Sequence, residues 1–230
     1  MNILIIGAAG GIGSQLLSDL SKDSSHNILV GFHKKKTETT HNSMEIDASK
    51  FEDVESFVSE GLKQFGNIHA VVNLPGNLIL KPAHLCDEDE FYKTIDINLK
   101  SSFAVVRSVG RLLSNCSVVL MSTAAVSIGL SNHELISSAK AGVEGLAKSA
   151  AKTYSRKNIR VNTVSPGLID TPMFSQEGAD RKAFIDSVTA SHSIKRAGKP
   201  EEVAKGIIFV IENDFVTGTI VDVDGGWINS

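Results

Sequence analysis

The sequence holds few of the residues that mark several common protein classes. Its 230 residues include two cysteines, one tryptophan, two tyrosines and five prolines. Cys86 and Cys116 are isolated and lack the spacing of metal ligands, so we expect no metal site and a reduced, cytoplasmic protein. No apolar stretch approaches the length of a membrane span, and Ile3–Ile6 runs directly into glycines, which favours a strand over a signal peptide.

A large excess of charge is also missing. Lys and Arg number 23 and Asp and Glu number 26, so the net charge is −3. This balance gives no electrostatic basis for binding nucleic acid or an anionic membrane, and we expect a small-molecule partner instead. Because 42% of the residues are hydrophobic and no repeat or linker interrupts them, residues 1–230 are expected to form a single domain.

Short β-rich runs alternate with helical patterns along the chain. Several of the runs are apolar throughout, as in parallel strands that are covered on both faces. The alternation predicts an α/β fold with a doubly wound parallel sheet in three layers, of the Rossmann type. Only residues 33–42 join the second and third runs, so the crossover helix there should be brief or missing. Strands are expected at 2–6, 28–32, 43–46, 69–73, 117–121, 159–164 and 219–223, and helices at 11–22, 53–65, 88–113, 137–155 and 200–211.

A glycine-rich turn follows the first predicted strand and opens a helix. It reads Gly7-Ala8-Ala9-Gly10-Gly11-Ile12-Gly13. Glycines let such a turn tighten and let a pyrophosphate approach the backbone N–H groups at a helix N-terminus. The alternative is a plain glycine-rich turn. The strand–turn–helix context favours a dinucleotide site.

Further motifs follow in an order that resembles the short-chain dehydrogenase/reductase family, in its classical branch. The Gly7-x3-Gly11-Ile12-Gly13 pattern is similar to the family fingerprint, and the resemblance covers essentially the whole chain. It implies an adenine contact at Asp47 and Ala48, a cofactor segment at Asn73 to Gly76, and a catalytic Asn at Asn98. It also places Pro166, Gly167, Ile169 and Thr171 beside the nicotinamide and the diphosphate. The C-terminal matches are Arg196-x-Gly198-x-Pro200-Glu201-Glu202-Val203-Ala204 and Gly218-x5-Asp224-Gly225-Gly226.

The end of the second predicted strand bears on the choice of cofactor. An NAD site usually places a carboxylate there, whereas the 2′-phosphate of NADP favours cations. This chain reads His33-Lys34-Lys35-Lys36, with no carboxylate before Glu38. The lysines could also form a solvated loop. The charge pattern favours NADP(H), with NAD(H) as the alternative.

The catalytic set that the resemblance implies is incomplete. In the family a Ser, a Tyr and a Lys act with the Asn, and the Tyr lies four residues before the Lys. Lys140 and Asn98 match, Thr123 stands at the Ser position, and Lys140 also matches the residue that holds the cofactor ribose. The Tyr position is Ile136, which can neither donate nor accept a proton.

No other tyrosine is expected to replace it. Tyr154 lies fourteen residues beyond Lys140, and Tyr92 should lie nearly opposite Asn98 on its helix. A proton could instead come through Thr123, a water held by Lys140 and Asn98, His133, or the substrate itself. For His133 the sequence favours a plain exposed loop histidine.

Two functions therefore stay open at this stage. The first is an NADP(H)-dependent oxidoreductase acting on a carbonyl or alcohol with a modified catalytic set. The second is a non-catalytic nucleotide-binding protein, such as a sensor or partner subunit. The resemblance also implies a homo-oligomer, either dimer or tetramer, built on the glycine- and alanine-rich helix after Ile136. Residues 173–196 are the expected substrate loop, although the substrate itself is not indicated.

Overall fold

A single parallel sheet organises the computed structural model, which describes residues 1–34, 39–173 and 179–229. Within these residues seven strands pair in the order β3-β2-β1-β4-β5-β6-β7, and every pairing is parallel. The strand order reverses between β1 and β4, the place where open α/β sheets bind their ligands. The strands are β1 Asn2–Ile6, β2 Asn27–Phe32, β3 Asn42–Glu45, β4 Ala70–Asn73, β5 Cys116–Met121, β6 Ile159–Pro166 and β7 Ile220–Val223.

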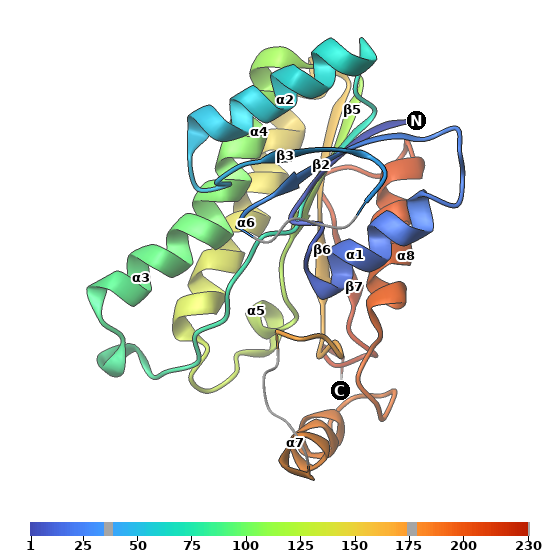
Figure 1. Ribbon diagram of the computed structural model, residues 1–230. Helices are drawn as coiled ribbons and strands as arrows, with labels where there is room; N and C mark the ends of the chain where they lie inside the picture. Colours follow the sequence, from blue (N-terminus) through green and yellow to red (C-terminus); the bar gives the residue numbers. More distant parts are fainter. Residues whose placement is uncertain (35–38, 174–178, 230) are drawn as a thin grey trace.

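Helices cover both faces of this sheet (Figure 1). On one face α2, α4 and α6 pack together, and on the other α1 packs beside α8. Helix α7 projects from the lower end of the molecule, next to the carboxyl ends of the strands. The α-helices are α1 Gly11–Leu20, α2 Phe51–Phe65, α3 Glu88–Ile95, α4 Ser101–Leu112, α5 Ala125–Ile128, α6 Glu134–Thr153, α7 Ala179–Thr189 and α8 Pro200–Glu212. A π-helical turn, Asp96–Lys100, joins α3 to α4, and 3₁₀ turns lie at Ala83–Leu85 and Ser155–Lys157.

The side-chain alternation of the strands divides the core into two halves. In β1, Leu4 and Ile6 pack toward α2, α4 and α6, whereas Ile3 and Ile5 pack toward α1 and α8. All four are at most 1% exposed. The unbroken apolar character of the strand follows from this burial on both faces, and it confirms the predicted doubly wound architecture.

The expected elements form with modest changes at their ends. The predicted helix at 88–113 is interrupted by the π turn at Asp96–Lys100, because one extra residue is inserted there. The predicted helix at 137–155 instead begins at Glu134, so Ile136 lies inside its first turn. Helices α5 and α7 were not expected. The short connection between β2 and β3 lies partly outside the described residues.

Candidate active site

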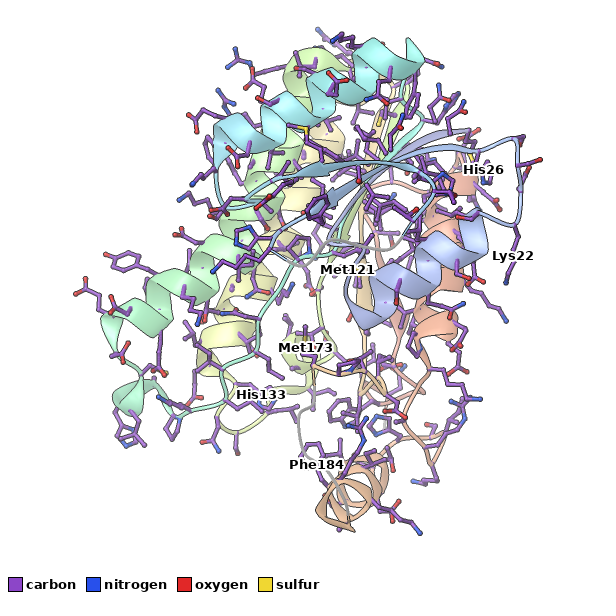
Figure 2. The ribbon with its side chains drawn as sticks, in the orientation of Figure 1. Lys22, His26, Met121, His133, Met173 and Phe184 are labelled. Atoms are coloured by element: carbon purple, nitrogen blue, oxygen red, sulfur yellow. The ribbon has the colours of Figure 1, made fainter. Side chains whose placement is uncertain are left out.

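A cavity of about 880 Å³ lies at the carboxyl edge of the sheet. Its wall is formed by the loops after β1, β4 and β6, the end of β5, the start of α6, and α7. Figure 2 labels four of the lining residues, Met121, His133, Met173 and Phe184, which come from different segments of the chain. The wall is mostly apolar, with a few polar groups, as is usual for small-molecule sites.

The glycine-rich turn forms one end of this cavity, and two of its glycines are required by the turn itself. Gly7 has a φ of +86°, and a Cβ there would lie 3.0 Å from the Pro75 ring. A Cβ on Gly13 would lie 2.4 Å from the Gly7 carbonyl oxygen. The turn leads into α1, whose first turn has no acidic residue and no side-chain cap. Its N–H groups are therefore available to an anionic group.

Lys140 projects from α6 toward the end of β5. Its Nζ donates a hydrogen bond of 3.0 Å to the Met121 carbonyl oxygen, and the residue is only 8% exposed. Burial lowers the pKa of Lys140 to about 8, because removal from water disfavours the charged ammonium. The ammonium has three N–H donors, so it can bind further acceptors inside the cavity.

Asn98 occupies the π turn between α3 and α4 and is 1% exposed. Its Nδ2 donates to Asn77 Oδ1 at 2.7 Å and to the Thr94 carbonyl oxygen at 3.0 Å. These acceptors fix the amide orientation, so Oδ1 points the other way and has no partner among the described residues. A Cβ built on Gly76 would lie 2.9 Å from this Oδ1 and 3.8 Å from Lys140 Nζ. The two polar atoms thus flank the same glycine.

Thr123 and Ile136 complete this part of the cavity wall. The Thr123 Oγ1 accepts a hydrogen bond from the Ala125 N–H at 3.3 Å, which still leaves its own O–H free to donate. Ile136 lies one helical turn before Lys140 and is 4% exposed. The helix therefore presents a hydrocarbon side chain and an ammonium group side by side.

Most of the predicted site residues meet at this cavity. Those that line it are Gly7, Gly11, Ile12, Gly13, Gly76, Asn98, Thr123, Lys140, Pro166, Gly167, Ile169 and Thr171.

The other predicted residues do not line it. His33 and Lys34 are exposed at the end of β2, whereas Lys35 and Lys36 lie outside the described residues. The Asp47 carboxylate accepts hydrogen bonds from Ser49, chiefly from its hydroxyl at 2.6 Å, and these lower the pKa of Asp47. Ala48 is buried. The Asn73 amide nitrogen donates to the hydroxyls of Ser101 and Ser102, each at 3.2 Å, so it points into the core.

Neither tyrosine belongs to the cavity wall. Tyr92 is 55% exposed on α3. The ring of Tyr154 packs against α4, where a Cβ added to Gly110 would lie 2.5 Å from it. Neither phenol is therefore in contact with the cavity, as the sequence led us to expect.

Several residues at or beside the cavity were not predicted. Asn77, directly after Gly76, contributes both its amide and its backbone to the Asn98 network. Ser122 donates a 2.6 Å hydrogen bond to the buried Glu144 carboxylate. Trp227 and residues of α7 close the outer side. Glu144 could have been found from the sequence, because it is an acidic residue on a helix face that is otherwise rich in alanine and glycine.

The described residues contain no group of three or more His, Cys, Asp and Glu side chains that could hold a metal ion. In the same part of the chain, no helix combines the length and the apolar character that crossing a membrane requires.

Comparison with known proteins places the chain among oxidoreductases. A family model described as enoyl-(acyl carrier protein) reductase matches residues 7–228. The 3-oxoacyl-[acyl-carrier-protein] reductase FabG of Thermotoga maritima is 30% identical, over 98% of this chain and 96% of that protein. A cyclohexanol dehydrogenase of an Acinetobacter species is 31% identical, over 97% of this chain and 93% of its own length.

Solved structures agree with the sequence relatives. The ligand-free aldohexose dehydrogenase of Thermoplasma acidophilum superposes with a TM-score of 0.89 at 26% identity, covering 100% of this chain and 94% of that one. A short-chain dehydrogenase/reductase of Brucella melitensis gives a TM-score of 0.88 at 27% identity, covering 98% and 95%. The family model, the relatives and the seven-stranded sheet agree, and the chain belongs to the classical short-chain dehydrogenase/reductase family.

Proposed function

We propose that this protein is an NADP(H)-dependent oxidoreductase that interconverts a small apolar ketone and its alcohol, with a catalytic set that lacks tyrosine. The observation that carries this proposal is the continuity of the cavity. A single hollow of about 880 Å³ is lined by the glycine-rich turn at one end and by Asn98, Thr123 and Lys140 further along. A dinucleotide and a small substrate can therefore meet beside these three polar side chains.

The residues present fit a dinucleotide. The uncapped N-terminus of α1 suits a pyrophosphate, and Gly10 leaves open space, since a Cβ there would meet only the Gly7 carbonyl oxygen at 3.7 Å. Lys140 has N–H donors for ribose hydroxyls, and Ile169 and Thr171 line the wall where the nicotinamide half would lie. When bound, the dinucleotide supplies or accepts a hydride.

The end of β2 supports NADP(H) over NAD(H). The described residues there, His33 and Lys34, are exposed and carry no negative charge that would repel a 2′-phosphate. Of the nearby carboxylates, Asp47 directs its Oδ1 at Ser49 in its own loop, whereas the exposed Glu45 pairs in register with Phe32. Lys35 and Lys36 follow in the sequence and add to the positive charge.

Ile136 is the residue that separates this site from that of a complete family member. We propose that it replaces the proton-donating tyrosine, so that the proton must travel by another route. Losing one general acid typically slows a reaction by about 10² to 10⁴-fold, while positioning and hydride transfer remain. A non-catalytic nucleotide-binding protein is the second candidate, and the apolar side chain of Ile136 is the observation that favours it.

We also propose that a second copy of the chain packs on the face formed by α4 and α6. A shallow apolar groove lies there, lined by Phe51, Ile95, Leu99, Phe103, Gly142 and Leu146. Phe103 is 49% exposed, and Gly145 has nothing within 4 Å of an added Cβ. Small residues on an exposed helix face allow close approach of another helix.

The central test measures NADPH binding and the effect on turnover of placing a tyrosine at position 136. Wild-type protein should quench or enhance NADPH fluorescence on binding and should slowly reduce cyclohexanone. Ile136→Tyr should raise the rate at least tenfold, because the phenol lies one turn before Lys140 and the ammonium lowers its pKa. Ile136→Phe is the matched control, with the same bulk and no hydroxyl, and should give no gain.

The double variant Ile136→Tyr/Lys140→Ala should lose most of that gain. If wild type and Ile136→Tyr both bind NADPH and neither turns over the ketone, the result would contradict the oxidoreductase proposal and support the non-catalytic one. A crystal structure of Ile136→Tyr should accompany the kinetics, since a larger side chain can be displaced by its neighbours.

Cofactor preference is tested at the lysine run. Changing Lys34, Lys35 and Lys36 together to Ala should weaken NADPH binding more than NADH binding, because only NADPH carries the 2′-phosphate. Raising the salt concentration should shrink the difference, since exposed charges are screened. Fluorescence titrations with each cofactor at low and high salt measure both effects. Equal losses for the two cofactors would argue against phosphate recognition.

The buried lysine should have a measurable effect on stability. Its pKa of about 8 in the folded protein lies below the usual value near 10.4. The folded state is therefore penalised below pH 8, where both states are protonated, and the penalty disappears as the pH rises past about 10.4. Lys140→Met removes this penalty but also loses the hydrogen bond to the Met121 carbonyl oxygen. The net effect should be a rise of about 1 to 2 kcal/mol in the free energy of unfolding at pH 7.

Urea unfolding of both proteins in the absence of cofactor, at pH 7 and pH 10, measures this difference. From pH 7 to pH 10 the free energy of unfolding of the wild type should rise relative to that of the variant. An Lys140→Met protein that is less stable than wild type at pH 7 would mean that the ammonium is well solvated or paired in the folded state.

The assembly proposal is tested at Gly145. Gly145→Glu meets open space within the monomer, so it should fold normally yet place a charge in the proposed interface. Sedimentation velocity should show a dimer or tetramer for wild type and a smaller species for the variant. Lys63→Glu on the exposed face of α2 is the control and should leave the assembly unchanged. A monomeric wild-type protein would refute the proposal.

A further inference from the structure

Few groups in the cavity can exchange a proton near neutral pH. Among the described lining residues, the titratable side chains are Lys140 and His133. Lys140 donates one N–H to the Met121 carbonyl oxygen at the inner end, and its other N–H groups are the donors assigned above to the ribose hydroxyls of the proposed dinucleotide. Thr123 has a hydroxyl that can pass a proton on but does not change charge in this pH range. His133 is thus the remaining candidate for a proton donor that can be recharged from solvent.

The contacts of His133 define which of its nitrogens can act. Its Nδ1 lies 2.8 Å from the Ser131 carbonyl oxygen. A carbonyl oxygen only accepts, so Nδ1 carries a hydrogen and donates it. The exchangeable proton is therefore on Nε2, which is protonated in the imidazolium and bare in the neutral ring. The bond to Ser131 also limits rotation of the ring, and His133 is half-buried in the wall of the cavity.

The helix places His133 in line with the rest of the site. His133 immediately precedes α6, three residues before Ile136 and seven before Lys140. Residues at this spacing share one face of a helix. All three side chains line the same cavity. A substrate that rests on the hydrocarbon side chain of Ile136 therefore has Lys140 on one side and His133 on the other.

We propose that His133 is the catalytic acid and base of this protein, exchanging a proton with the substrate oxygen through Nε2. The proposal rests on the oxidoreductase function proposed above. In the reducing direction the carbonyl carbon receives the hydride from the reduced dinucleotide, and the π electrons of the C=O bond move to oxygen. The N–H bond at Nε2 breaks, an O–H bond forms, and the products are alcohol, oxidised dinucleotide and neutral imidazole. Solvent then reprotonates the ring.

The surroundings of His133 give the expected sign of the pH dependence. On α6 the charged residues nearby are Glu134, next in sequence and exposed, and Lys140. The described lining residues from the other elements are uncharged. Reduction consumes the proton of the imidazolium and oxidation of the alcohol needs the neutral ring, so rising pH should slow reduction and speed oxidation.

The test uses cyclohexanone with NADPH and the variant His133→Gln, whose amide can hydrogen-bond but cannot titrate. Because the His133 side chain makes no capping bond to α6, the replacement should not weaken the helix. We expect kcat for reduction to fall by about 10²-fold or more, NADPH affinity to stay unchanged, and the fall of the rate with rising pH to disappear. His84→Gln is the matched control, because His84 is exposed and does not line the cavity.

Two further measurements separate chemistry from structure. Added imidazole should restore at least part of the activity of His133→Ala, which leaves a space at the ring position. Cyclohexanecarboxamide, an unreactive carbonyl compound, should bind wild type more tightly at pH 5.5 than at pH 7. His133→Gln should bind it equally at both, because Lys140, with a pKa of about 8, stays mostly protonated over this range.

The outcomes distinguish the two proposals. If wild type binds NADPH but turns over no ketone or alcohol, the oxidoreductase function fails and His133 has no reaction to serve. If wild type is active and His133→Gln keeps its rate and pH profile, only the assignment of His133 is overturned. An active wild type whose His133→Ala variant is inactive and gains nothing from imidazole would also overturn it, because a space-filling role explains that result.

Discussion

The candidate site depends on the burial of one ammonium group between α6 and the end of β5. The hydrogen bond from Lys140 Nζ to the Met121 carbonyl oxygen joins the helix to the strand. Because Met121 is followed by Ser122 and Thr123, this bond also fixes the Thr123 hydroxyl relative to the helix. The Asn98 amide reaches the same place from the π turn between α3 and α4, beside Gly76. Three separate elements are thus brought together around a charge that is expensive to bury.

The glycine-rich turn imposes the matching constraint at the other end of the cavity. Gly7 has a positive φ and lies against Pro75, while the backbone of Gly13 is pressed onto the Gly7 carbonyl oxygen. The turn therefore lies against the loop after β4 with no room for a side chain at Gly7, and the same loop carries Gly76 and Asn77. The two ends of the cavity share this loop, so a change in the glycine-rich turn would reach Asn98 through a few residues of backbone.

The sequence predicted the sheet more reliably than it predicted the site. Burial on both faces makes strands such as β1 and β5 almost entirely apolar, and their ends follow within a residue or two. The start of α6 was placed three residues late, because its N-cap is His133, which makes no capping bond, whereas Ser137 resembles a cap. The contact between Asn98 and Asn77 joins residues 21 positions apart, so no local pattern could reveal it. Helix α7 lacks the apolar stripe from which a helix is predicted.

The retention of Lys140 bears on whether the site is in use. A lysine whose pKa is held near 8 by burial destabilises the fold at neutral pH, and an apolar residue at the same position would remove that penalty. Asn98 adds a buried carbonyl oxygen without a partner among the described residues, which is a second unfavourable feature at the same place. Both costs are recovered when polar groups of a ligand enter the cavity and bind these atoms. Ile136 lacks a proton donor, and it lies beside Lys140 in a cavity wall that keeps these two polar groups. If the cavity no longer bound a ligand, replacing Lys140 and Asn98 would increase the stability of the fold. Their presence beside Ile136 therefore favours a site with a different proton donor over a site that has lost its function.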